Sequence, residues 1–184
     1  MAGTNRKQEK LLPHYDHPLP FVRLYWHRVM QELVKQIDAK EDELIVDFGC
    51  GKQRLKRYLP GHNIIGYDPI KEYSDIADYR VLRPHTIVCS HVLEHMDRPQ
   101  LISIIEDFMR MGLKCLITAQ PTENFLSRLS NLLGRPTVIT QNLRPLDHRL
   151  KMSEVHDILC EHFLLKSRCS VWTLTVISKW SPVI

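Results

Sequence analysis

The sequence predicts a single α/β domain built on a mainly parallel sheet, and three observations support this prediction. Its 184 residues correspond to one compact domain of ordinary size. Short β-branched runs alternate with segments of helical periodicity, as in sheets that carry helices on both faces. The first of these runs ends in a turn with two glycines, Gly49 and Gly51, directly before a helical segment.

The elements follow one another without an internal repeat. Helices are predicted over 21–38, 54–59, 98–111, 124–133 and 153–160. Strands are predicted over 44–48, 63–67, 86–90, 113–119, 164–168 and 171–178. Almost no connection separates the last two strands, so they are expected to pair antiparallel. The first helix has an apolar residue at every fourth position from Phe21 to Ile37, which indicates an amphipathic helix.

The composition excludes several classes of protein. The longest apolar runs span about half a dozen residues, whereas a membrane-spanning helix needs about 20. Residues 1–10 lack the apolar stretch of a secretory signal. These two observations predict a cytoplasmic protein. The five cysteines are an odd number and no two form a C-x-x-C pair, so we expect reduced thiols. The net charge of +4 is mild and far from the dense basic clusters of a dedicated nucleic-acid binder.

The strongest functional signal is the segment Val46-Asp47-Phe48-Gly49-Cys50-Gly51. It lies where the first strand ends and a helix begins, which is where open α/β sheets bind ligands. Glycines at such a turn let the backbone bend tightly and approach a ligand closely. Asp68 ends the second strand, close to the spacing at which an acidic residue binds a ribose diol.

Two other nucleotide-binding motifs are excluded at this loop. A dinucleotide fingerprint needs a third glycine at the position of Arg54, and a Walker loop needs a following Gly-Lys-Ser/Thr. Neither is present. With Asp47 before the turn, the loop suits an adenosine that carries a cationic amino-acid tail better than it suits a pyrophosphate.

These residues resemble the class I S-adenosylmethionine-dependent methyltransferases. Asp47-Phe48-Gly49-Cys50-Gly51 is similar to their first motif, and Gly66-Tyr67-Asp68-Pro69 is similar to their second. The segment from Val88 to His95 is similar to the part after the fourth strand in the branch that methylates small molecules and quinones. The resemblance extends from about Leu44 to Pro121 and implies a Rossmann-like methyltransferase fold for residues 1–184 as one domain.

The resemblance also implies a site for S-adenosylmethionine, whose product is S-adenosylhomocysteine. Asp47 would hold the methionine amino group, directly or through water, and Asp68 would accept both ribose hydroxyls. The implied cofactor-binding residues are Asp47, Gly49, Cys50, Gly51, Asp68, Pro69, Ile70 and Ser90. Either Asp75 or Asp78 would contact the adenine amino group.

The chain departs from the family pattern in two places. Gln53 replaces the third glycine of the first motif. The link between Asp68 and Thr86 is short, so the third strand of the family and its flanking helices are expected to be very short or partly missing.

The segment His91-Val92-Leu93-Glu94-His95 follows the fourth strand of the family pattern and would face the sulfur end of the cofactor. Histidine titrates near neutral pH, so His91 or His95 is a candidate for the base that removes a proton from an acceptor hydroxyl. Alignment alone also accelerates methyl transfer, and a histidine that caps a helix or fills the core is the alternative. The strand directly before it argues against the helical H-x-x-E-H site of a zinc protease, and no metal ligand is assigned.

Two segments are expected to select the methyl acceptor, as in relatives. Residues 1–20, polar and then rich in proline, would form an arm or lid. Residues 122–150 would form an insertion on the substrate side. Within it, Arg144, His148 and Arg149 could bind an anionic substrate or belong to a solvated loop.

The sequence thus predicts transfer of a methyl group from S-adenosylmethionine to an oxygen, nitrogen or carbon of a small molecule. Two alternatives stay open. One is a catalytically silent methyltransferase-like subunit that only binds a cofactor or a partner protein, and the other is an RNA or protein methyltransferase. The signature of nucleic-acid amino-methyltransferases, Asp or Asn followed by Pro-Pro and an aromatic residue, is absent, which argues against a nucleic-acid partner.

Overall fold

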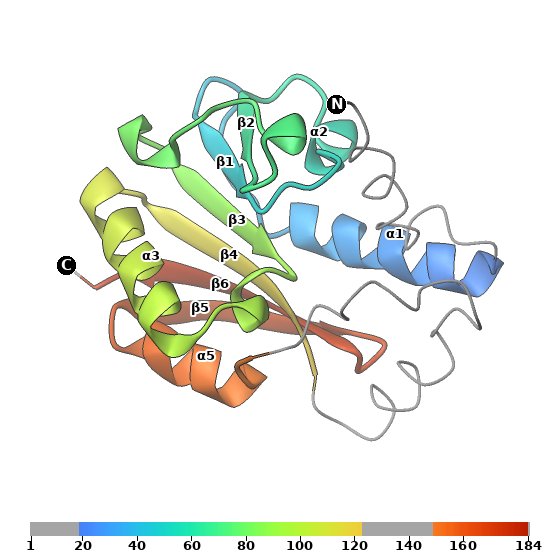
Figure 1. The fold of residues 1–184 in the computed structure, drawn as a ribbon. Helices are drawn as coiled ribbons and strands as arrows, with labels where there is room; N and C mark the ends of the chain where they lie inside the picture. Colours follow the sequence, from blue (N-terminus) through green and yellow to red (C-terminus); the bar gives the residue numbers. More distant parts are fainter. Residues whose placement is uncertain (1–18, 123–148, 184) are drawn as a thin grey trace, which may run out of the picture.

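The computed structural model describes residues 19–122 and 149–183. Its centre is a six-stranded sheet with the strand order β2-β1-β3-β4-β6-β5 (Figure 1). The strands are β1 (Ile45–Phe48), β2 (Ile64–Tyr67), β3 (Thr86–Ser90), β4 (Cys115–Pro121), β5 (Phe163–Val171) and β6 (Thr175–Pro182). Strands β1 to β4 are mutually parallel, and β6 is antiparallel to both of its neighbours, β4 and β5. The predicted parallel sheet with an antiparallel last strand is confirmed.

Helices cover both faces of this sheet (Figure 1). The α-helices are α1 (Pro20–Val34), α2 (Leu55–Tyr58), α3 (Arg98–Met111) and α5 (Met152–Cys160). Residues of α1 and α2 pack on one face, and residues of α3 and α5 pack on the other. Across the described ranges, no helix has both the length and the apolar character needed to cross a bilayer.

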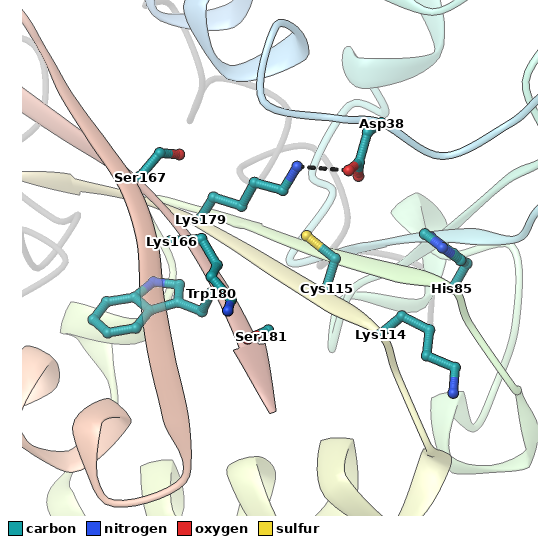
Figure 2. Close-up of a pocket in the computed structure, with 9 residues that line it drawn as sticks. All are labelled: Asp38, His85, Lys114, Cys115, Lys166, Ser167, Lys179, Trp180 and Ser181. Atoms are coloured by element: carbon teal, nitrogen blue, oxygen red, sulfur yellow. Dashed lines mark ion pairs between the residues drawn. The ribbon is translucent and has the colours of Figure 1, made fainter. Parts of the chain in front are cut away.

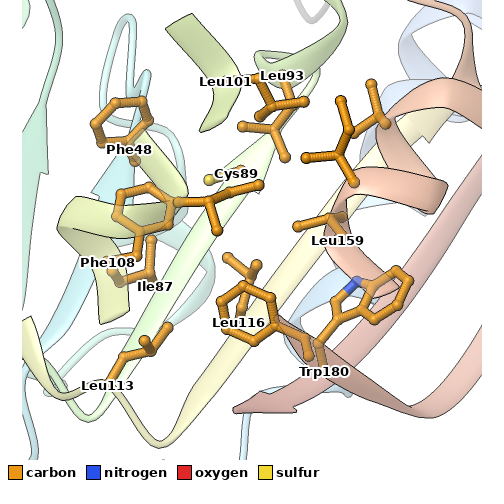
Figure 3. Packing of buried hydrophobic residues seen from close by; sticks show 14 of the residues in the cluster. Phe48, Ile87, Cys89, Leu93, Leu101, Phe108, Leu113, Leu116, Leu159 and Trp180 are labelled. Atoms are coloured by element: carbon orange, nitrogen blue, oxygen red, sulfur yellow. The ribbon is translucent and has the colours of Figure 1, made fainter. Parts of the chain in front are cut away.

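The core is divided by the sheet because successive strand residues point to opposite faces. In β1, Ile45 packs on the side of α1 and Val46 on the side of α3. Figure 3 shows the α3 side, where Phe108 of α3 lies beside Ile87 and Leu159 of α5 lies near Trp180, all in one cluster over the strands. Burial on both faces explains why these strands are continuous apolar runs rather than alternating patterns.

Helix α3 has the bounds that its sequence signals predict. Asp97 caps its start by accepting from the Gln100 backbone N–H at 2.9 Å, and the Gln100 side chain accepts from the Asp97 N–H in return. Its end is Gly112, which adopts the left-handed conformation with φ 74°.

The shortened region around the missing third strand is also confirmed. Between β2 and β3 all residues are described, and they contain two short 3₁₀-helices, η1 (Lys71–Tyr73) and η2 (Tyr79–Val81), but no strand. Strand β2 therefore forms one edge of the sheet.

The largest errors in the predicted boundaries lie at the last two strands and at the end of the first helix. The turn between the last two strands lies at Trp172 and Thr173, which have φ values of 49° and 58°. Val171 consequently ends β5 instead of starting β6. Helix α1 ends at Val34, and its predicted apolar residue Phe21 is 61% exposed because this end of the helix extends beyond the core. The predicted arm, except residues 19–20, and the predicted helix 124–133 lie outside the described residues.

Candidate functional site

The loop after β1 is tied to the end of β2 by backbone hydrogen bonds. The N–H groups of Gly49 and Cys50 both donate to the Tyr67 carbonyl, at 2.7 and 3.1 Å. Gly49 and Gly51 have φ values of 76° and 48°, a conformation that favours glycine. The two glycines therefore shape a tight loop at the carboxyl ends of two parallel strands.

Asp68, which directly follows β2, lies against this loop. Its Oδ2 accepts from the Gly51 N–H at 3.0 Å, and its Oδ1 accepts from the Ile70 N–H at 2.9 Å. The two bonds fix the orientation of the carboxylate. A carboxylate has about four lone-pair positions, so each oxygen keeps capacity for one further donor.

Asp47 is buried at 6% exposure beneath the same loop. Burial raises the pKa of its carboxyl group to about 7, against the attraction of Lys56 and with the added repulsion of Asp68 and Asp75. The nearby positive charge is too weak to offset the cost of burying the carboxylate. A cationic group placed beside Asp47 would supply the missing compensation.

The segment after β3 packs directly on the glycine loop. A β-carbon built on Gly49 would lie 2.3 Å from Cγ2 of Val92, far inside van der Waals contact. The space beside Gly49 is thus filled by the residue that follows His91. The glycine loop and the histidine segment form one packed unit.

Gln53 stands where the motif of the family that the sequence resembles has its third glycine. It adopts φ 53°, the left-handed conformation that glycine would take without strain. Its side chain offsets this strain, because Nε2 donates to the Tyr73 carbonyl at 2.8 Å and to Asp75 Oδ1 at 2.9 Å. Lys56 Nζ donates to its Oε1 at 2.7 Å.

The two aspartates considered for the adenine contact have protein partners. Asp75 Oδ2 accepts from the Gly66 N–H at 2.7 Å and from Lys56 Nζ at 2.6 Å, which anchors the loop after β2. Asp78 starts η2 and binds the guanidinium of Arg80 through both oxygens, at 2.8 and 2.9 Å. Both carboxylates support the shortened region, and the adenine contact stays a prediction.

Both ring nitrogens of His91 face protein side chains. Nδ1 lies 3.4 Å from Oε1 of Glu94, and Nε2 lies 3.3 Å from Oγ1 of Thr175 on β6. Thr175 is fully buried, and its hydroxyl also forms a 2.5 Å hydrogen bond with the Tyr25 hydroxyl of α1. The His91 ring packs edge-on against Trp26, with centroids 4.9 Å apart.

Glu94 lies in the 3₁₀-helix η3 (Leu93–His95) and is 1% exposed. Within the described residues, neither carboxylate oxygen has a hydrogen bond of ordinary length, and the nearest polar group is Nδ1 of His91, 3.4 Å from Oε1. Burial would raise the pKa of Glu94, but the rings of His91 and His95 hold it below its usual value. The backbone carbonyl of Glu94 accepts from the N–H groups of Arg149 and Leu150, at 2.8 and 3.2 Å.

The remaining predicted site residues are placed around this unit. Pro69 and Ile70 follow β2, and Ser90 ends β3 directly before His91. Cys50 is buried, and its thiol donates to the Tyr73 carbonyl at 3.3 Å, so it acts as a packing residue. Burial, with nearby carboxylates, raises the pKa of this thiol to about 12. Arg144 and His148 lie outside the described residues, and the exposed Arg149 lies 3.7 Å from Asp97.

Sequence reasoning missed three residues at this site. Tyr25 and Trp26 come from α1 and Thr175 from β6, far from the motif in the chain. Glu94 had a local signal, because it follows His91 by three positions, the spacing of neighbours on a helical turn. Nothing in the spacing of the sequence connects Thr175 with His91.

An open hollow of about 500 Å³ lies at the opposite ends of the strands, where β3 and β4 begin (Figure 2). It is lined by Lys114 and Lys166 and by Lys179, which pairs with Asp38 at 2.8 Å. Open α/β sheets bind ligands at the carboxyl ends of their strands, so the hollow lies on the wrong edge for the site described above.

Solved structures share the fold of this chain at low sequence identity, whereas sequence comparison finds no relative. No family model and no functionally curated protein matches the sequence. The PH0226 protein from Pyrococcus horikoshii OT3 superposes with a TM-score of 0.69 at 15% identity, covering 95% of this chain and 97% of that chain.

Two similar structures are methyltransferases solved with S-adenosylhomocysteine. The magnesium protoporphyrin IX methyltransferase ChlM from Synechocystis PCC 6803 has a TM-score of 0.61 at 17% identity, covering 88% of this chain and 85% of its own. The N-methyltransferase NodS from Bradyrhizobium japonicum WM9 has a TM-score of 0.61 at 14% identity, covering 90% and 89%. At these identities the likeness shows that the fold is that of the class I S-adenosylmethionine-dependent methyltransferases.

Proposed function

We propose that this chain transfers a methyl group from S-adenosylmethionine to a small-molecule acceptor. The observation that carries the proposal is the placement of two carboxylates, Asp47 and Asp68, on adjacent strand ends around one glycine loop. S-adenosylmethionine presents a cationic amino group and a ribose diol, which match the two carboxylates in chemistry. The fold shared with ChlM and NodS adds support.

Each carboxylate has a separate role in this proposal. Asp47 would bind the amino group of the methionine part, because that cation relieves the cost of its burial. Asp68, oriented by the N–H groups of Gly51 and Ile70, would accept the ribose hydroxyls. Ser90, Pro69 and the loop after β1 would complete the contact. S-adenosylmethionine supplies the chemistry of an electrophilic methyl group on a positively charged sulfur.

The acceptor would lie next to the histidine segment. Val92 joins that segment to the glycine loop, so His91 is held beside the cofactor-binding residues. The rings of Tyr25, Trp26 and Trp172 pack together there and would give an apolar small molecule an aromatic wall. The cytoplasmic location predicted from the sequence is part of the same proposal.

The test is transfer of a labelled methyl group. The full chain is incubated with S-adenosylmethionine carrying tritium in the methyl group, together with separate cell fractions of small molecules, RNA and protein. The proposal predicts label in the small-molecule fraction only, lost in the Asp68→Asn variant. Label in RNA or protein would instead support the second alternative, and tight cofactor binding with no label in any fraction would indicate a silent binding subunit.

A further inference from the structure

Four side chains form a continuous polar line from the core to the edge of the proposed acceptor site. The line runs from Glu94 through His91 and Thr175 to Tyr25, with successive separations of 3.4, 3.3 and 2.5 Å. It joins η3, the end of β3, the start of β6 and helix α1. Exposure is lowest at Glu94 and Thr175, and only Tyr25 and His91 are partly accessible.

The geometry limits how His91 can act. Its Nδ1 faces the Glu94 carboxylate and its Nε2 faces the Thr175 hydroxyl, so neither nitrogen is directed at open space. A molecule beside the cofactor cannot hand a proton to either nitrogen directly. The proton must instead pass through Thr175, whose hydroxyl has one further neighbour, the hydroxyl of Tyr25.

We propose that Tyr25, Thr175 and His91 form a proton relay, positioned by Glu94, which makes the methyl acceptor a hydroxyl group on an apolar molecule. The inference rests on the proposed function and narrows its acceptor from oxygen, nitrogen or carbon to a hydroxyl. Tyr25 touches the acceptor, and Glu94 acts through His91 as a positioning residue.

The reaction forms one bond, breaks another and moves a proton from the acceptor to His91. The acceptor oxygen forms a bond to the methyl carbon with its own electron pair, and the methyl–sulfur bond breaks with its pair remaining on sulfur. The acceptor proton passes to the Tyr25 oxygen, the Tyr25 proton to Thr175 Oγ1, and the Thr175 proton to Nε2 of His91. His91 becomes a cation beside the Glu94 carboxylate and later returns the proton to water.

The choice of acceptor follows from what a proton relay contributes. A hydroxyl oxygen is a weak nucleophile until its proton leaves, whereas a neutral amine attacks with a free electron pair and a carboxylate has already lost its proton. Burial raises the pKa of Tyr25, so its hydroxyl stays protonated near neutral pH. Tyr25 therefore passes a proton on to Thr175 and does not remain as a phenolate. The rings of Trp26 and Trp172 pack against Tyr25, with centroids 5.2 and 5.6 Å away, which gives the acceptor apolar surroundings.

The first test needs no substrate. Nitrogen-15 NMR of histidine side chains in the ligand-free chain reports which ring nitrogen of neutral His91 carries the proton, with His91→Gln to assign its signals. The relay predicts a proton on Nδ1, donated to Glu94, with Nε2 accepting from Thr175. A proton on Nε2 would overturn the relay, because Thr175 would then accept from His91 and no proton could pass.

The second test identifies the methylated atom in the labelled product by mass spectrometry. A methyl ether is expected. A methylamine, a methyl ester or a carbon-linked methyl group would overturn the relay while leaving the proposed function intact. Failure to bind cofactor or transfer any label would contradict the proposed function, and the NMR result would still test the relay by itself.

The third test is kinetic. Tyr25→Phe and Thr175→Val should each lower kcat by about 10- to 100-fold without changing the affinity for S-adenosylhomocysteine. The matched control is Tyr58→Phe, whose hydroxyl also contacts α1, through His27, but lies outside the line. Equal kcat for Tyr25→Phe and Tyr58→Phe would overturn the relay.

Glu94→Gln separates positioning from a purely structural role. The titratable groups placed along the line in the described chain are Glu94, with His95 beside it, His91 itself and Tyr25. Removing the negative charge of Glu94 disfavours the cationic form of His91. The acid limb of the pH profile of kcat should therefore move to lower pH, whereas a profile that falls in height without moving would overturn the assignment.

Discussion

The side chain of Val92 occupies the space that a β-carbon would need at Gly49, with Cγ2 2.3 Å from the position of that carbon. This contact makes the glycine obligatory for packing as well as for backbone conformation. It also holds the segment that carries His91 against the loop that carries the proposed cofactor-binding residues. The spacing between the two parts of the site therefore depends on one glycine.

The first prediction concerns Gly49→Ala, with Gly112→Ala as the matched control. Both glycines have nearly the same left-handed φ, 76° and 74°, but nothing lies within 4 Å of a β-carbon at Gly112. Conformational strain should cost the control about 1 to 2 kcal/mol of unfolding free energy. Gly49→Ala should lose about 1 to 3 kcal/mol more through overpacking, part of which Val92→Ala restores. Chemical denaturation measures these values, and equal losses in the two glycine variants would contradict the account.

The second prediction concerns Gln53, whose φ of 53° places a residue other than glycine in the left-handed conformation. Gln53→Ala keeps the left-handed backbone strain and loses the hydrogen bonds to Tyr73, Asp75 and Lys56. Gln53→Gly loses the same bonds but relieves the strain. The free energy of unfolding of the glycine variant should therefore be about 1 kcal/mol higher than that of the alanine variant. If alanine proves as stable as wild type, the side-chain bonds do not offset the strain.

The third prediction concerns the pH dependence of stability without ligand. Burial raises the folded-state pKa of Asp47 from 3.8 to about 7, so the folded chain binds more protons than the unfolded chain between these values. The unfolding free energy contributed by this group is highest at low pH and falls as the pH rises toward 7. Asp47→Asn removes the titrating carboxyl group and with it this loss of stability. Above pH 7 the free energy of unfolding of the variant should exceed that of wild type by on the order of 2 to 4 kcal/mol.

The control for Asp47→Asn is the same comparison at pH 4, where wild type carries a protonated Asp47 and the two proteins should have similar stability. Thermal and urea unfolding across pH 4 to 8 provide the data. The same variant should lose affinity for S-adenosylhomocysteine, so stability and binding change in opposite directions. A stability difference that does not vary with pH would contradict the assigned burial of charge.

How well the sequence predicted each element depended on whether its signals were local. Strand β3 and helix α3 have the predicted bounds, because a β-branched run and the caps Asp97 and Gly112 define them. The turn at Trp172 was missed because a bulky aromatic residue rarely adopts a positive φ. Here the tertiary structure overrode local preference.

The same distinction holds for the site. Asp47 and Asp68 could be placed at one edge of the sheet because a parallel sheet brings successive strand ends together, which sequence order alone implies. Thr175 lies next to His91 only because β6 inserts beside β4 from the end of the chain, 84 residues later. Such a contact depends on how the sheet is completed and leaves no local pattern. The role of Gln53 likewise became visible only with its backbone angle.

The measurement that tests the central claim most directly is calorimetric titration of the ligand-free chain with S-adenosylhomocysteine. NAD serves as the control ligand. Asp68→Asn removes the charge of the proposed acceptor of the ribose hydroxyls, and Asp38→Asn is the control, because its carboxylate pairs with Lys179 at the opposite ends of the strands. We expect binding of S-adenosylhomocysteine alone, weakened at least about tenfold by Asp68→Asn and unchanged by Asp38→Asn. Absence of binding, or equal binding of NAD, would contradict the assignment of this loop to S-adenosylmethionine.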